Sequence, residues 1–97
     1  MRLSTHSLAN EDLRRAVLYY LGEASPAVAV RFMAEYNRVV RLLLEHPRAG
    51  TLRNKGRRGF PLDGFPYSVI YREVPDGIRV VVVKHHSQRP NYGDRRR

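Results

Sequence analysis

The chain has 97 residues, with 18 Lys and Arg against 9 Asp and Glu, a net charge of +9, and neither cysteine nor tryptophan. We expect a single domain over residues 1–97, because a second core in so short a chain would bury too little surface, and the 42 % hydrophobic content excludes wholesale disorder. The absence of cysteine excludes a disulfide scaffold, a zinc finger with thiolate ligands and a cysteine nucleophile.

The first predicted elements are a short strand and a helix. Residues 2–6 alternate roughly in polarity, which is compatible with a strand. Ser7 is a suitable N-cap for a helix from about Leu8 to Leu21, and Gly22 supplies a left-handed stop. Apolar side chains recur in this helix at three- and four-residue spacing and predict one buried stripe: Leu13, Ala16, Val17, Tyr20 and Leu21.

A second helix follows after a short connection. Ser25 is a favourable N-cap, Pro26 suits the first helical position, and His46-Pro47 ends the helix. Its apolar stripe is longer and includes aromatic and methionine side chains, which at this spacing indicate core packing: Ala29, Phe32, Met33, Tyr36, Val40 and Leu43. The two helices therefore predict an antiparallel helical hairpin.

The second half of the chain predicts a sheet. Residues 48–59 are basic and rich in glycine, which indicates a loop, and the polar residues 87–97 predict an irregular basic tail. Three strands are expected between them, at about 58–62, 65–74 and 78–86. The valine run of the last strand is typical of a central strand that is covered on both faces. The fold class is therefore α+β, a two-layer βααβββ domain whose helical hairpin packs on a small, mostly antiparallel sheet.

The positive charge is concentrated in the second half of the chain. Residues 1–47 carry six basic and five acidic side chains, whereas residues 48–97 carry twelve basic and four acidic ones. This asymmetry predicts an anionic partner, either nucleic acid or an acidic protein segment, and the alternative is a solvated face with a basic tail. No stretch approaches 18 uninterrupted apolar residues and no apolar signal core is present, so we expect a soluble, cytoplasmic protein without membrane contact.

The sequence contains no motif for nucleotide binding, metalloprotease or serine hydrolase chemistry. His85 and His86 would point to opposite faces of a strand and would not chelate one metal, so we expect neither a metal nor a cofactor. Two-carboxylate catalysis is not expected either. The acidic residues are assigned to a helix N-terminus, where they favour the dipole, or to turns: Glu11, Asp12, Asp63 and Asp76.

A polar cluster at the end of the last strand is the strongest candidate site. It comprises Lys84, His85, His86, Gln88, Arg89 and Tyr92. A basic loop could meet this cluster, because the loop leads into a neighbouring strand: Arg53, Lys55, Arg57 and Arg58. A histidine, a tyrosine and arginines around a groove suit metal-free RNA cleavage, but the same set also grips phosphate or an acidic peptide. The residue types favour binding over catalysis.

Together these segments resemble the ParE/RelE superfamily of toxins from bacterial type II toxin–antitoxin modules. The matching segments cover almost the whole chain, and they are Ala9–Leu13, Tyr19-Tyr20, Ser25-Pro26, Ala29, Phe32, Leu43, His46-Pro47, Gly50, Phe65–Arg72 and the valine strand that leads into His85–Tyr92. The family fold is the βααβββ arrangement. ParE-like members poison DNA gyrase, whereas RelE-like members cut messenger RNA on the ribosome.

The resemblance implies a ParE-type toxin first. Most of the basic constellation of the ribonuclease branch is absent, because Gly59, Pro61 and Ser68 stand near its positions. His86 and Tyr92 keep the alternative of a RelE-like, metal-independent endoribonuclease open, since a variant branch uses a C-terminal histidine and tyrosine. A non-toxic nucleic-acid-binding module is a third hypothesis.

The resemblance also implies the partners. A ParD-like antitoxin would neutralise the toxin, and operator DNA would be bound only through that antitoxin. On the ParE interpretation no residue is catalytic, and the basic side chains bind the target or the antitoxin: Arg53, Lys55, Arg57, Arg58, Lys84, His85 and Arg89. Exposed sheet edges would accept an added strand, and the seam beside the helical hairpin would accept an amphipathic helix.

Overall fold

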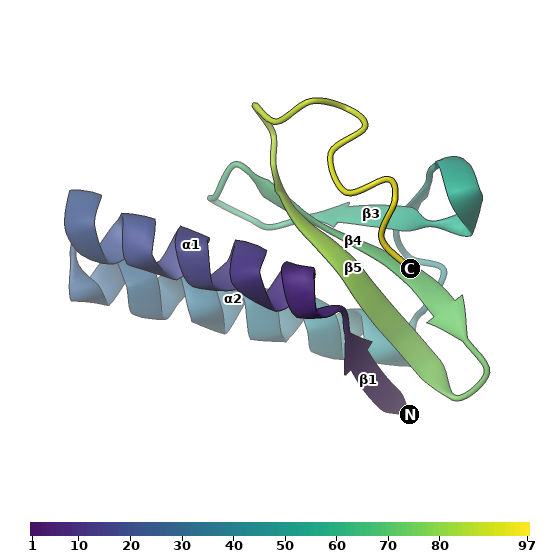
Figure 1. The fold of residues 1–97 in the computed structure, drawn as a ribbon. Helices are drawn as coiled ribbons and strands as arrows, with labels where there is room; N and C mark the ends of the chain where they lie inside the picture. Colours follow the sequence, from purple (N-terminus) through teal and green to yellow (C-terminus); the bar gives the residue numbers. More distant parts are fainter.

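The computed structural model describes all of residues 1–97 as two helices packed on a five-stranded mixed sheet (Figure 1). The elements are β1 (Arg2–Thr5), α1 (Ser7–Glu23), α2 (Pro26–Glu45), β2 (Thr51–Leu52), the 3₁₀ turn η1 (Asn54–Gly56), β3 (Arg58–Pro61), β4 (Tyr67–Val74) and β5 (Gly77–His85). The strand order is β1-β5-β4-β3-β2, with β1 parallel to β5 and every other pair antiparallel. The predicted α+β class and the βααβββ order are confirmed.

Helix α1 begins one residue earlier and ends later than predicted. Its N-cap is His6 rather than Ser7, because the His6 backbone is extended and its Nδ1 accepts a hydrogen bond from the Leu8 amide at 3.0 Å. The His6 amide is itself held by the carbonyl oxygen of Val80 at 2.9 Å. Gly22 lies inside the helix and does not adopt a left-handed conformation, so the predicted glycine stop was wrong.

Helix α2 follows the sequence prediction closely. Ser25 is the N-cap, its Oγ accepts from the Val28 amide at 3.2 Å, and Pro26 occupies the first helical position. The main core lies between the hairpin and the sheet, and it contains four residues of the predicted stripe of α2: Phe32, Tyr36, Val40 and Leu43. Ala29 is buried as well but lies outside this cluster. No helix of the structure combines the length and the apolarity that crossing a bilayer requires.

Strand β5 is central and buried on both faces, as its valine run indicates. Val80 and Val83 face the helices in the main core, whereas Val81 and Val82 belong to a second cluster with Ile70. The register shift between β4 and β5 lies at this point, and it lets two successive valines join the same cluster. The second cluster is covered by the C-terminal segment, residues 87–97, which crosses the face of the sheet that the helices leave open (Figure 1).

The connection from α2 to β3 was predicted as a plain loop, but it contains β2 and η1. The buried hydroxyl of Tyr71 organises its start by donating to the Pro47 carbonyl at 2.7 Å and accepting from the Gly50 amide at 2.9 Å. Gly50 allows this close approach, because a Cβ there would lie 2.7 Å from the Tyr71 hydroxyl. The loop is thus fixed by a side chain that is remote in sequence.

Candidate functional site

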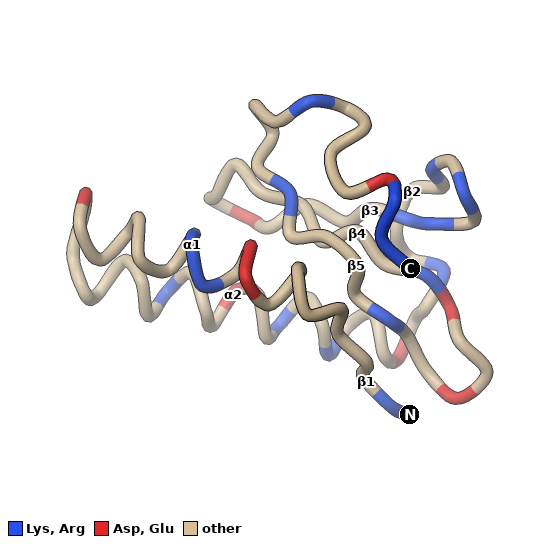
Figure 2. Tube along the Cα trace, viewed as in Figure 1, with Lys and Arg blue, Asp and Glu red and all other residues tan.

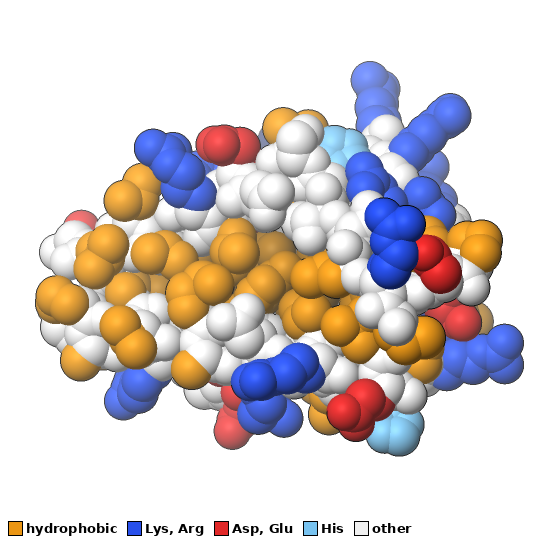
Figure 3. All heavy atoms as spheres, turned by 90° about the horizontal axis from the view of Figure 1, so that it is seen from below, with side chains coloured by type: hydrophobic (Ala, Val, Ile, Leu, Met, Phe, Trp, Pro, Cys, Tyr) orange, Lys and Arg blue, Asp and Glu red, His pale blue; other side chains and the backbone are white.

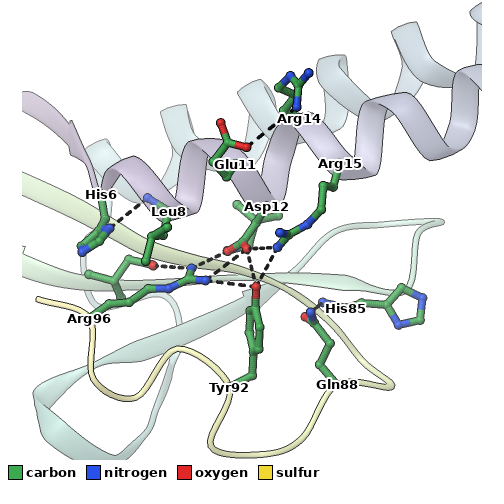
Figure 4. Close-up of polar contacts among 12 residues, drawn as sticks. His6, Leu8, Glu11, Asp12, Arg14, Arg15, His85, Gln88, Tyr92 and Arg96 are labelled. Carbon is green, nitrogen blue, oxygen red and sulfur yellow. Dashed lines mark hydrogen bonds and ion pairs between the residues drawn. The ribbon is translucent and has the colours of Figure 1, made fainter.

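A buried carboxylate on α1 is the centre of the most connected polar cluster (Figure 4). The Asp12 side chain is 2 % exposed, and Arg96 binds it through Nη1 at 2.5 Å and Nη2 at 3.2 Å. Arg15 Nη2 at 2.8 Å, the Tyr92 hydroxyl at 2.7 Å and the Val83 amide at 3.1 Å also donate to it. The expected role of Asp12 as a helix-dipole charge was therefore wrong, because the residue lies in the second turn and faces the sheet.

Side chains of this cluster also cover the free edge of β5. Strand β1 pairs with β5 only as far as Val80. Beyond that point Arg96 Nη1 donates to the Val81 carbonyl at 3.1 Å, Asp12 accepts from the Val83 amide, and Gln88 Oε1 accepts from the His85 amide at 2.9 Å. These side chains oppose strand addition at this part of the edge, because three of its backbone groups already have partners.

The predicted basic loop contains two structural arginines. Arg57 is 4 % exposed and donates to the backbone carbonyls of Gly93 at 3.0 Å, Asp94 at 3.5 Å and Arg96. Burial lowers the pKa of Arg57, and the neighbouring arginines lower it further against the opposing charge of Asp94. Arg58 donates to the Gly50 carbonyl at 3.0 Å. Both residues hold chain segments in place, whereas Arg53 and Lys55 are exposed.

The cluster at the end of β5 does not meet the basic loop, contrary to expectation. Arg58 pairs with Tyr71, and Tyr71 pairs with Val80, which lies five residues before His85 on β5. His85 instead pairs with Tyr67 and packs edge-on against its ring at 4.9 Å. The antiparallel register thus places the two groups at different ends of the sheet, and the C-terminal segment reaches the loop instead.

The other candidates at this end have local contacts. Lys84 Nζ donates to the Gln88 carbonyl at 3.0 Å, and Arg89 is exposed without a side-chain partner. His86 Nε2 lies 3.0 Å from the Ser68 Oγ, whereas the Tyr92 hydroxyl is held by Asp12, Arg15 and Arg96. His86 and Tyr92 therefore share no contact and do not form an assembled acid–base pair.

A cationic pocket of about 620 Å³ lies between η1, the end of β4 and the C-terminal segment, and Figure 2 shows the basic stretches that surround it. It is lined by no hydrophobic residue, and its lining comprises Lys55, Arg57, Arg72, Asp94, Arg95, Arg96 and Arg97. Arg72 and the three terminal arginines were not singled out from the sequence. The signal for the terminal arginines was the run Arg95–Arg97, which the sequence assigned only to an irregular basic tail, with a solvated face as the alternative to an anionic partner.

An apolar groove of about 470 Å³ runs along the outer side of the helical hairpin. Its walls come from both helices, and they are Val17, Leu21, Pro26, Ala29, Val30, Met33, Ala34 and Asn37. Val30 is 68 % exposed and Leu21 is 45 % exposed, although Leu21 was predicted to be buried. Figure 3 shows hydrophobic side chains as a continuous band along this face with basic side chains beside it. This groove corresponds to the predicted seam for an amphipathic helix.

Comparison with known proteins supports both the family resemblance of the sequence and the observed fold. Residues 3–90 match the family model described as the ParE toxin of the type II toxin–antitoxin system parDE. A solved structure described as the chromosomal ParDE TA system from P. aeruginosa superposes with a TM-score of 0.75 at 22 % identity, covering 88 % of this chain and 95 % of that chain. At this identity the likeness concerns the fold. No curated protein matches the chain.

Proposed function

We propose that this chain, which belongs to the ParE toxin family of type II toxin–antitoxin systems, inhibits DNA gyrase and is neutralised by a ParD-like antitoxin. The family match carries the proposal, because it extends from β1 to Pro90 and so includes both helices and all five strands. The fold alone would not be sufficient, since one fold hosts different functions.

The arrangement of the candidate catalysts favours gyrase inhibition over RNA cleavage. An acid–base ribonuclease needs a proton acceptor and a proton donor that face one substrate. In this chain the Tyr92 hydroxyl already donates to Asp12, and His86 contacts Ser68 on β4. Poisoning a topoisomerase requires binding but no chemistry by the toxin itself, so we expect the chain not to be an enzyme.

The apolar groove on the hairpin supports an antitoxin as the partner. An amphipathic helix would lay its apolar face between α1 and α2, against residues such as Val30 and Met33. The net charge of +9 favours an acidic partner segment, and a segment that folds on binding would stabilise this small domain. Operator DNA would then be bound through the antitoxin.

A supercoiling assay tests the gyrase proposal. The toxin is released from its antitoxin, refolded, and added to gyrase with relaxed plasmid, and the same toxin with its antitoxin restored is the control. Inhibition with trapped cleaved DNA, reversed by the antitoxin, is the expected result. Active gyrase in the presence of a folded and growth-inhibiting toxin would refute the proposal, and cleavage of ribosome-bound messenger RNA would then support the RelE-like alternative.

A further inference from the structure

Six basic side chains and one acidic side chain, Asp94, line the cationic pocket, and of the six only Arg96 has a carboxylate partner, Asp12. Lys55, Arg95 and the Arg97 side chain line the pocket without any hydrogen bond or ion pair of their own. Behind them lies the buried Arg57 guanidinium, whose partners are neutral backbone carbonyls. The Arg57 charge is hydrogen-bonded only to carbonyl groups, so an anion bound in the pocket would offset an excess of positive charge.

We propose that the cationic pocket binds phosphate groups of a nucleic-acid backbone. Lysine and arginine side chains are the usual phosphate contacts in nucleic-acid complexes, and they neutralise successive charges along the strand. The pocket contains no aromatic side chain on which a base could stack and no apolar wall. It therefore reads charge and spacing, and the binding is independent of base sequence.

The lining of the pocket favours nucleic acid over an acidic protein segment. Protein interfaces combine arginine anchors with aromatic and apolar ones, and this pocket has arginines but no apolar or aromatic side chain. The surface that suits a protein helix is the apolar groove on the hairpin, which is formed by other residues. The two surfaces share no residue, so antitoxin and nucleic acid would occupy separate sites.

The pKa of His6 can report on the positive charge of the cationic pocket, because His6 lies beside it. A neighbouring depression contains His6 and shares Lys55, Asp94, Arg95 and Arg96 with the cationic pocket. Burial lowers the pKa of His6, and the charges of Arg79, Arg96 and Arg57 lower it further. A phosphate bound in the pocket would offset that positive field, and the pKa of His6 would rise.

The test compares two variants that lose the same charge. Lys55→Gln with Arg95→Gln removes two exposed cations of the pocket, and Arg31→Gln with Arg41→Gln removes two exposed cations from α2. Binding of the full chain to labelled duplex DNA and to single-stranded RNA is measured across a salt series, with circular dichroism as the folding check. Because no gyrase is present, the result is independent of the gyrase proposal.

The pocket variant is expected to bind at least about tenfold more weakly at low salt, with the slope of log affinity against log salt reduced by about two on duplex DNA. The α2 variant should stay close to wild type. NMR titration should show the pKa of His6 rising when DNA is added to wild type, but not to the pocket variant. Weaker binding of the pocket variant to DNA alone, or to RNA alone, would identify that nucleic acid as the ligand and support the site.

Three outcomes would overturn the proposal. Equal weakening by both variants would mean that overall charge, rather than the pocket, attracts nucleic acid. Unchanged affinity of the pocket variant for DNA and RNA would refute the nucleic-acid site, and weaker binding of an acidic antitoxin peptide would then assign the pocket to a protein partner. Inorganic phosphate serves as the competitor in both series, and failure to compete with wild type at low salt would also count against a phosphate site.

Discussion

The Asp12 carboxylate and the Arg96 guanidinium, 84 positions apart in the chain, form a buried ion pair with two contacts at 2.5 and 3.2 Å. The pair fastens the C-terminal segment to the first helix, because Tyr92 and Arg96 both bind Asp12 while Arg57 holds the carbonyls of the same segment. The segment in turn covers the second cluster of β4 and β5 and forms one wall of the cationic pocket.

Replacing Asp12 with alanine should destabilise the protein by about 3–5 kcal/mol, because it leaves the buried Arg96 without a counter-charge. The measurement is the free energy of unfolding in urea. Glu11→Ala is the matched control, since the exposed Glu11–Arg14 pair at 3.8 Å is worth less than about 1 kcal/mol. Equal losses for the two variants would contradict the anchoring role of Asp12.

Tyr71→Phe should cost about 1–3 kcal/mol, because the buried Gly50 amide and the Pro47 carbonyl would both lose their partner. Thermal unfolding measures the loss. Tyr19→Phe removes an exposed hydroxyl without a protein partner and should change stability little. The prediction fails if the two substitutions have the same effect.

Two glycine-to-alanine substitutions should have opposite effects on the stability of the fold. A Cβ on Gly77 would lie 1.8 Å from the Arg2 carbonyl oxygen, so Gly77→Ala should separate β1 from β5 and abolish amide-exchange protection in β1. Gly22 lies inside α1 with nothing within 4 Å of its would-be Cβ, so Gly22→Ala should stabilise the protein by about 0.5–1 kcal/mol. Loss of stability in Gly22→Ala would contradict its helical placement.

The free energy of unfolding should decline as the pH falls below 6.5, the ordinary pKa of histidine, because the pKa of His6 is lowered in the folded protein. Below this pH the His6 side chain takes up a proton more readily in the unfolded chain than in the folded one, which favours unfolding. The full stabilising contribution of His6 is therefore present above pH 6.5. The measurement is the free energy of unfolding against pH. His6→Asn retains a capping side chain without titrating and should flatten this part of the profile, whereas an unchanged profile would exclude His6 as the cause.

Val30→Asp should weaken antitoxin binding by at least about tenfold, because it places a charge in the apolar groove that a helix would cover. Leu52→Asp is the matched control, since Leu52 on β2 is also 68 % exposed but lies outside the groove. Calorimetric titration with the antitoxin measures both. Similar affinities for the two variants would place the antitoxin elsewhere.

The element order was predictable because it depends on signals that lie close together in the chain. The apolar stripes of both helices, the Ser25-Pro26 helix start and the Asp63-Gly64 turn are all local patterns, and the structure contains each element that they predict. The loop between α2 and β3 gave no such signal. Its β2 strand and η1 turn form because Tyr71 and the pairing with β3 organise them from a distance.

The sequence by itself determined the α+β class, the helical hairpin and the basic second half. Only the tertiary structure decided which charges are buried and which remain free. Asp12 is followed by Arg15 at helix spacing, which suggests a surface pair, but its main partner is Arg96. The sheet register likewise separates Arg58 from His85, which a linear pattern had placed in one groove. Burial and register depend on contacts between distant segments, and these exist only once the chain has folded.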